Sequence, residues 1–235
     1  RTVGLAKLLG AIVVGKTVTA EFATHEAGFT LNPHNQDRLA GTSSTGSAVA
    51  VACGMVPVAL GTQTAGSIIR PASYCGVVGF KPSFGLIPRT GILKTADTLD
   101  TVGWLSRSVA DVRLLLQALS VRGHNYPMAD RGQARAAAKT DFSKPLRLLL
   151  AYPPTWDDAD DQVRDQLVDY ARQIGNRPDI VVEEADLRDT FADAHSILRT
   201  IYNKQLSYYF QRELQTPFRI SDAFRDVTDA GMKVT

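Results

Sequence analysis

The sequence has almost no net charge. It contains 26 lysine and arginine residues against 24 aspartate and glutamate residues, which gives a formal net charge of +2. Recognition of nucleic acid or of an anionic membrane surface usually depends on a clear positive excess, so we predict neither partner. The 4 histidines are scattered, with no zinc-type spacing to one another or to the cysteines. We therefore expect no metal site and no cofactor.

Cysteine is also rare, because it occurs only at Cys53 and Cys75, each in apolar surroundings. Free buried thiols are expected rather than a disulfide. No signal peptide is visible, and we expect a cytoplasmic protein. The 235 residues, 44% of them hydrophobic, suffice for one substantial core, so a single domain over residues 1–235 is expected.

Charge is missing altogether between Arg38 and Arg70. A membrane span does not explain this gap, because serines and threonines crowd both ends, Gly54 and Pro57 lie inside, and the apolar middle is too short. The stretch instead indicates two hydroxyl-rich loops around a small-residue helix and an apolar strand. Single loops of this kind can be simple turns, but two of them favour a buried polar site. A hydroxyl beside converging main-chain N–H groups offers acyl transfer a nucleophile and stabilisation of the oxyanion.

The whole run of residues 41–82 closely resembles the amidase signature, a block rich in glycine and serine. It reads GTSSTGSAVAVACGMVPVALGTQTAGSIIRPASYCGVVGFKP. Weaker similarity continues on both sides, over residues 15–22 and 99–111. The resemblance implies an α/β fold with a central mixed sheet and helices on both faces. It also implies a small-molecule amide substrate, whose C–N bond is hydrolysed through a serine acyl-enzyme.

Matching positions carry the family's residue roles onto this sequence. Ser67 matches the nucleophile, and Ser43 matches a bridging serine that follows a cis peptide bond. The oxyanion hole is implied to consist of main-chain N–H groups of the second loop, from Thr64, Ala65, Gly66 and Ser67. Positions expected to support the site are Ser44, Gln63 and Arg70.

The family's third catalytic member is a lysine in a hydrophobic-Lys-Asp context, and the sequence before Ser43 does not contain it. Only Lys7, in a helix-like context, and Lys16, in the family's separate Gly-Lys-Thr element, occur there. We favour a truncated chain that begins after the lysine and also lacks a C-terminal part. The alternative is a degenerate, inactive homologue. Lys81 follows Ser67 closely in the sequence, and we interpret it as structural.

Three functions are therefore considered. The first, which we predict, is an amidase, and the other two are alternatives. The second is an amidotransferase subunit that releases ammonia from glutamine within a complex. The third is a non-catalytic homologue that binds ligands without turnover. A homodimer is an open option for each of them.

Hydrophobic patterns along the chain predict further secondary structure. Apolar runs predict strands at residues 11–14, 55–60, 77–80, 146–151 and 179–184. Apolar positions at helical spacing predict helices at residues 2–10, 47–54, 108–119, 160–174, 190–213 and 220–235. Ser108 is expected to cap its helix, with Asp111 three residues on.

Overall fold

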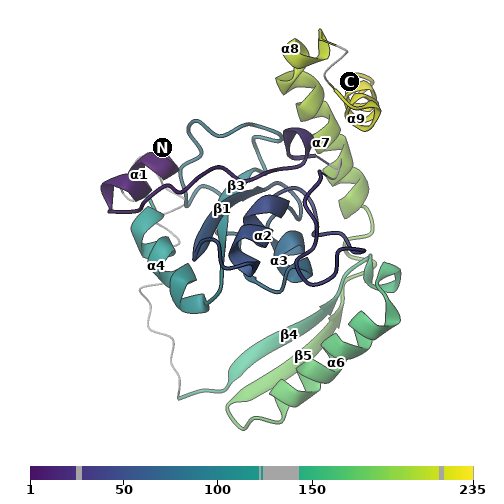
Figure 1. The fold of residues 1–235 in the computed structure, drawn as a ribbon. Coiled ribbons are helices and arrows are strands. Elements are labelled where there is room, and N and C mark those ends of the chain that lie inside the picture. The colour runs from purple at the N-terminus through teal and green to yellow at the C-terminus, as the bar shows by residue number, and fades with distance from the viewer. Residues whose placement is uncertain (25–27, 122, 124–142, 217–219, 235) are drawn as a thin grey trace. The chain divides into compact units, whose positions relative to one another are not determined.

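The computed structural model describes residues 1–24, 28–121, 123, 143–216 and 220–234 (Figure 1). The chain divides into two compact units, one of residues 1–135 with 200–235 and the other of residues 136–199. Within these residues, strands and helices follow one another along the chain, and the strands form two small sheets, one antiparallel and one parallel. The predicted α/β class is confirmed.

The sheet of the first unit has three antiparallel strands in the order β1-β3-β2. They are β1 (Val58–Gln63), β3 (Thr101–Ser106) and β2 (Val78–Phe80). The central strand β3 is buried at every residue. Its register sets Gln63 opposite Thr101, at the end of β1 from which the second hydroxyl-rich loop leaves.

Helices cover both faces of this sheet, as predicted, because the side chains of β3 alternate between two hydrophobic clusters. Val102 and Trp104 pack with α1 (Thr2–Leu8) and α4 (Val109–Leu119). Leu105, on the other face, packs with α2 (Thr45–Ala52) and α3 (Ile69–Tyr74). Figure 1 shows α2 and α3 side by side across the strands. In the sequence, α2 precedes β1 and α3 follows it. The first hydroxyl-rich loop leads into α2 and the second leads into α3, and a main-chain hydrogen bond from Ser44 to Ser67 joins the two loops.

Helix α4 begins as predicted. The Ser108 hydroxyl accepts a hydrogen bond from the main-chain N–H of Asp111 at 3.1 Å. The same serine donates to the Asp111 carboxylate at 2.7 Å. Donors of the first turn that would lack a partner are thereby satisfied.

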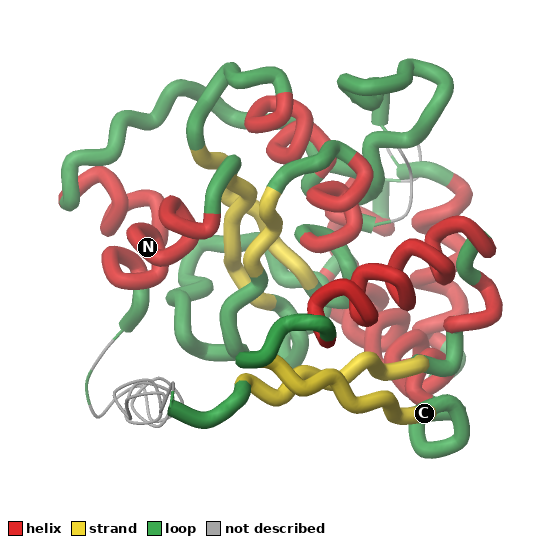
Figure 2. Tube along the Cα trace, turned by 90° about the horizontal axis from the view of Figure 1, so that it is seen from below, coloured by secondary structure: helices red, strands yellow, loops and turns green. Residues whose placement is uncertain are grey.

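The second unit is built on two parallel strands, β4 (Leu146–Tyr152) and β5 (Ile180–Asp186). The crossover between them contains a short 3-10 turn, η2 (Trp156–Asp158), and helix α6 (Asp161–Gly175). Figure 2 shows the two strands running side by side with α6 along them. The three predicted elements of this unit are confirmed.

Three helices follow, α7 (Ala194–Tyr209), α8 (Gln211–Leu214) and α9 (Asp222–Met232). The single helix predicted for residues 190–213 is thus interrupted at Phe210. The Phe210 ring packs against Phe22 and Phe224, at centroid distances of 4.9 and 5.2 Å. Phe22 precedes α2 in the chain, in the short 3-10 turn η1 (Glu21–Ala23), so this aromatic cluster joins two distant parts of the first unit. No helix of the described ranges is long and apolar enough to cross a membrane.

Two sequence predictions are wrong. The run at residues 11–14 is not a buried strand, because Ile12, Val13 and Val14 are 88%, 55% and 76% exposed. A strand needs a hydrogen-bonded neighbour, and none of the described strands pairs with this run. Cys53 is exposed rather than buried, because it lies where the chain leaves the end of α2. Cys75 is buried, and both cysteines are free. Burial, followed by the nearby Cys53, raises the pKa of the Cys75 thiol.

Candidate active site

The first hydroxyl-rich loop is fastened on two sides. The peptide bond between Thr42 and Ser43 is cis. The Ser43 carbonyl accepts a hydrogen bond from the Ala20 N–H at 3.0 Å. The Ser44 hydroxyl lies against β1, where it donates to the Thr62 carbonyl at 3.3 Å and accepts from the Thr62 N–H at 3.4 Å. Ser43 and Ser44 are buried, at 1% and 4% exposure, so this loop is part of the interior.

The second loop, Thr64 to Ser67, follows β1 directly, and its main-chain carbonyls after Thr64 all accept hydrogen bonds. Ala65 accepts from the Gln63 side-chain amide at 2.7 Å. Gly66 accepts from the Arg70 N–H at 2.9 Å, and Ser67 accepts from the Ser44 N–H at 3.3 Å. These bonds hold the carbonyl side of each peptide in place.

The N–H side of the same peptides is left open. Within the described residues, the main-chain N–H groups of Thr64, Ala65, Gly66 and Ser67 donate no hydrogen bond. The next two N–H groups, of Ile68 and Ile69, differ because both donate to the Gln63 side-chain oxygen, at 2.9 and 3.0 Å. The buried Gln63 side chain therefore binds the N–H groups that follow the loop. The four N–H groups of the loop itself, from Thr64 to Ser67, keep no partner among the described residues.

The hydroxyls of Ser43 and Ser67 remain without a hydrogen bond to any described residue, and they make none to each other. Ser67 is half-buried and Ser43 is buried. The structure thus joins the two loops through the main-chain bond from Ser44 to Ser67 rather than through a bond between the two hydroxyls.

The remaining predicted residues surround the second loop or lie apart from it. Arg70 is exposed, and a methyl group built on Gly66 would lie 3.4 Å from its Nη2 atom. Lys81 donates to the carbonyl of its neighbour Pro82 at 2.9 Å. Lys7 and Lys16 are exposed. Among the described residues, no lysine is hydrogen-bonded to either catalytic serine candidate.

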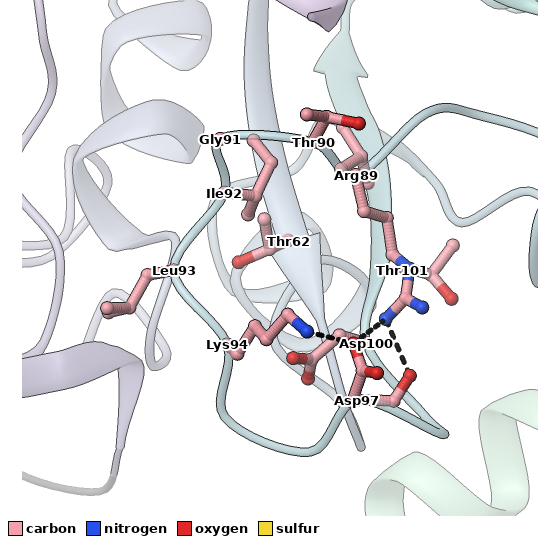
Figure 3. Close-up of a pocket in the computed structure, with 11 residues that line it drawn as sticks. Thr62, Arg89, Thr90, Gly91, Ile92, Leu93, Lys94, Asp97, Asp100 and Thr101 are labelled. Atoms are coloured by element: carbon pink, nitrogen blue, oxygen red, sulfur yellow. Dashed lines mark hydrogen bonds and ion pairs between the residues drawn. The ribbon is translucent and has the colours of Figure 1, made fainter. Parts of the chain in front are cut away.

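A cavity of about 510 Å³ opens against β1 and β3 (Figure 3). It is lined by Thr62 of β1, by the residues 89–94, and by Asp97, Asp100, Thr101 and Val102. Ion pairs from Arg89 and Lys94 to Asp97, at 3.3 Å each, cross its wall. Neither Ser43 nor Ser67 lines this cavity.

Sequence reasoning missed one buried acid near the loop. Asp100 is 6% exposed and accepts a hydrogen bond from the Thr64 hydroxyl at 2.6 Å. It also influences Tyr202, since burial and then the charge of Asp100 raise the pKa of Tyr202 to about 12, against the opposing effect of Arg70. The similarity over residues 99–111 was the available signal, but it assigns no role to the acid.

The profile of the amidase family, described as Amidase, matches residues 1–233. The chain therefore belongs to the amidase family. It is similar to the crystal structure of an amidase, with a TM-score of 0.81 and 28% identity, over 100% of this chain and 52% of that one. It is also similar to a peptide amidase in complex with the competitive inhibitor chymostatin, with a TM-score of 0.69 and 30% identity, over 92% of this chain and 47% of that one.

A curated relative is more similar in sequence over a shorter range. This relative, a glutamyl-tRNA(Gln) amidotransferase subunit of Picosynechococcus sp., is 49% identical over 122 residues, which are 49% of this chain and 25% of the relative. The chain thus spans a quarter of this relative's length and about half the length of either solved protein.

Proposed function

We propose that the two loops form the acyl-transfer centre of an amidase. Ser67 is the nucleophile, Ser43 is the bridging serine, and the N–H groups of Thr64, Ala65, Gly66 and Ser67 receive the oxyanion. Ser44, Gln63 and Arg70 support this arrangement. The substrate is a small molecule with a carboxylic amide.

One observation carries this proposal. The second loop leaves four consecutive N–H groups without a partner among the described residues, while the following carbonyls are bonded. None of the four residues is buried, so their N–H groups are open to an oxygen that enters the loop. Donors fixed before the reaction begins stabilise charge that develops on a substrate oxygen, because they do not have to reorient.

The proposed reaction has two halves. The Ser67 oxygen attacks the amide carbonyl carbon, and its proton passes through the Ser43 hydroxyl to a base and then to the leaving nitrogen. The C–N bond breaks, the amine leaves, and an ester to Ser67 remains. Water then attacks this ester, releases the acid and returns a proton to Ser67. The family resemblance assigns the role of the base to a lysine that this sequence does not contain.

The test compares serine variants of the complete gene product. Ser67→Ala should lower turnover of a reporter amide at least ~1000-fold, because removal of a catalytic serine removes the covalent route. It should also abolish labelling by a serine-directed acylating probe, read by mass spectrometry. Ser73→Ala changes an exposed serine of α3 and is the matched control. Full activity of the Ser67 variant would refute the nucleophile assignment.

A second candidate is suggested by the curated relative, whose name is that of an amidotransferase component. In this case the same serine would release ammonia from glutamine for use within a complex. Faster release of ammonia from glutamine than from simple aliphatic or aryl amides, together with a co-purifying partner, would favour this candidate. A wild-type protein with neither turnover nor labelling would instead indicate a homologue that only binds ligands.

The organisation around this centre remains proposed as well. We propose one amidase domain over residues 1–235, a cytoplasmic location and, as an option, a homodimer. Sedimentation of the purified protein would test the homodimer.

A further inference from the structure

Asp100 is a buried carboxylate that the proposed reaction does not use. It is 6% exposed and ends the loop that leads into β3. Figure 3 shows it in the wall of the cavity, close to Asp97. Arg89 and Lys94 pair with Asp97, and no described cation pairs with Asp100. A buried carboxylate without a cation needs hydrogen-bond donors. The groups that donate to Asp100 are therefore the groups whose positions this carboxylate fixes.

Those donors come from two separate segments. One Asp100 oxygen accepts from the Thr95 N–H at 2.8 Å, and the Ala96 N–H lies 3.1 Å from both oxygens. The other oxygen accepts from the Thr95 hydroxyl at 2.7 Å and from the Thr64 hydroxyl at 2.6 Å. Thr95 and Ala96 belong to the same local turn as the acid. Thr64 is the distant partner, and it is the first residue of the second loop.

The number of protons fixes the direction of these contacts. The Thr64 and Thr95 hydroxyl oxygens also lie 2.8 Å from each other, so three close contacts share two hydroxyl protons. The contacts to the carboxylate are the shorter pair, and an ionised carboxylate only accepts. Both hydroxyls therefore donate to Asp100, and the Thr64 side chain is held in one rotamer by a charge-assisted bond.

The loop is consequently anchored at both ends. At its far end, Gln63 binds the N–H groups of Ile68 and Ile69 and the Ala65 carbonyl. At its near end, the Thr64 hydroxyl is bonded, among the residues that the structure describes, to Asp100 and Thr95 alone. The Thr64 N–H is one of the four proposed oxyanion donors. A change in the backbone angles of Thr64, which the bond from its hydroxyl restrains, would turn this N–H away from the substrate oxygen.

We propose that Asp100 is a positioning residue for acyl transfer, which acts through the Thr64 hydroxyl to orient the main-chain donors of Thr64 to Ser67. This inference rests on the proposed function. Asp100 itself does not contact the substrate, and its effect is confined to the step in which the oxyanion forms. Loss of the bond between Asp100 and the Thr64 hydroxyl should therefore lower kcat and leave substrate affinity unchanged.

The experiment uses the complete gene product and three threonine variants. Thr64→Val keeps the branched shape and removes the hydroxyl. It should lower kcat at least ~10-fold with KM within about twofold, a smaller loss than the roughly hundredfold or more for complete removal of an oxyanion donor. Thr64→Ser keeps the hydroxyl and should restore kcat to within about threefold of wild type on the same grounds.

Thr228→Val is the matched control, because Thr228 is also buried and its hydroxyl donates to the Phe224 carbonyl within α9 rather than to the loop. It should leave kcat unchanged within about twofold, since it touches no oxyanion donor. Should Thr64→Val not fold, Asp100→Asn gives the same test, because its neutral amide cannot accept from every present donor. We expect a fall in kcat of at least ~10-fold there too.

Equal kcat values for Thr64→Val and Thr228→Val would overturn the inference. A change in KM alone, a failure of Thr64→Ser to restore kcat, or full kcat in Asp100→Asn would also overturn it. The Ser67→Ala variant separates the two levels of the proposal. If Ser67→Ala is inactive while Thr64→Val is fully active, only the role of Asp100 fails. If Ser67→Ala is fully active, the proposed function itself fails.

Discussion

The main-chain N–H of Ser44 donates to the main-chain carbonyl of Ser67 at 3.3 Å. This bond joins two loops that lie on either side of β1 in the sequence. It also means that the first loop is fixed relative to the second without a hydrogen bond between the Ser43 and Ser67 side chains. Side-chain substitutions at Ser43 or Ser67 should therefore change chemistry while the two loops stay in place.

Replacement of Gln63 by leucine should destabilise the protein. The buried side-chain oxygen accepts from Ile68 and Ile69, and loss of this acceptor leaves two N–H groups without a partner. A cost of about 1–3 kcal/mol in the free energy of unfolding is expected from the N–H of Ile68, which is buried, and less from that of Ile69, which is 47% exposed. Ser73→Ala, at an exposed position of α3, is the control and should change stability by no more than about 0.5 kcal/mol. Urea denaturation compares the two variants, and equal stability would contradict the assigned role of the oxygen.

Alanine at Gly103 should be poorly tolerated in the central strand. A methyl group there would lie 2.1 Å from the Phe80 carbonyl oxygen and 2.9 Å from an Ile68 methyl carbon. Overpacking of this kind costs roughly 1–3 kcal/mol or more. Gly4→Ala, in α1 with nothing within 4 Å, is the control and should gain up to about 1 kcal/mol from helix propensity. Thermal melts of both variants give the comparison, and a neutral Gly103 variant would argue against the close strand pairing.

Glycine at Ala23 should stabilise the protein or leave it unchanged. Ala23 has φ of 60°, a left-handed conformation that L-residues with a side chain adopt at a cost of about 1–2 kcal/mol. Glycine removes that cost but adds freedom to the unfolded chain, so a net gain of up to about 1 kcal/mol is expected. Ala230→Gly, on the exposed side of α9, should instead lose up to about 1 kcal/mol. A loss at Ala23 as large as at Ala230 would contradict the left-handed geometry.

The stability should fall in alkaline solution partly because of Tyr202. Its folded-state pKa of about 12 lies above the ordinary tyrosine value of 10.0, so the folded protein keeps the phenol protonated for longer than the unfolded chain does. The contribution is complete below pH ~10 and is lost as the pH rises through about 12, on the order of 3 kcal/mol. Denaturation at several pH values should show that, above pH ~10, the free energy of unfolding of Tyr202→Phe falls less steeply with pH than that of the wild type. Parallel curves for wild type and variant would exclude this contribution.

Features carried by local sequence were predictable. The Ser108 cap needs only residues 108–111, and the two loops lie within one continuous block. The central strand β3 was missed because both of its faces are buried, so its side chains show no alternation of apolar and polar residues. Asp100 was missed for another reason, since its distant partner Thr64 lies 36 residues away and only the fold brings them together.

The run at residues 11–14 shows the opposite limit. Its apolar pattern is that of a buried strand, but pattern alone cannot show whether a partner strand is present. In the structure these residues are exposed instead. Whether residues 11–14 are buried depends on which other parts of the chain pack against them, and a short stretch of sequence does not show this.

The Ala20 N–H donates to the Ser43 carbonyl, and two residues further on the Phe22 ring packs against Phe210 and Phe224. These contacts link α9, which contains Phe224, to the first hydroxyl-rich loop. A deletion that removes α9 would spare every residue of both serine loops. It would nevertheless remove the Phe224 ring that packs on Phe22, and the turn that holds the Ser43 carbonyl through Ala20 would lose support. Loss of α9 should consequently disturb the loop around Ser43, which lies far from it in the sequence.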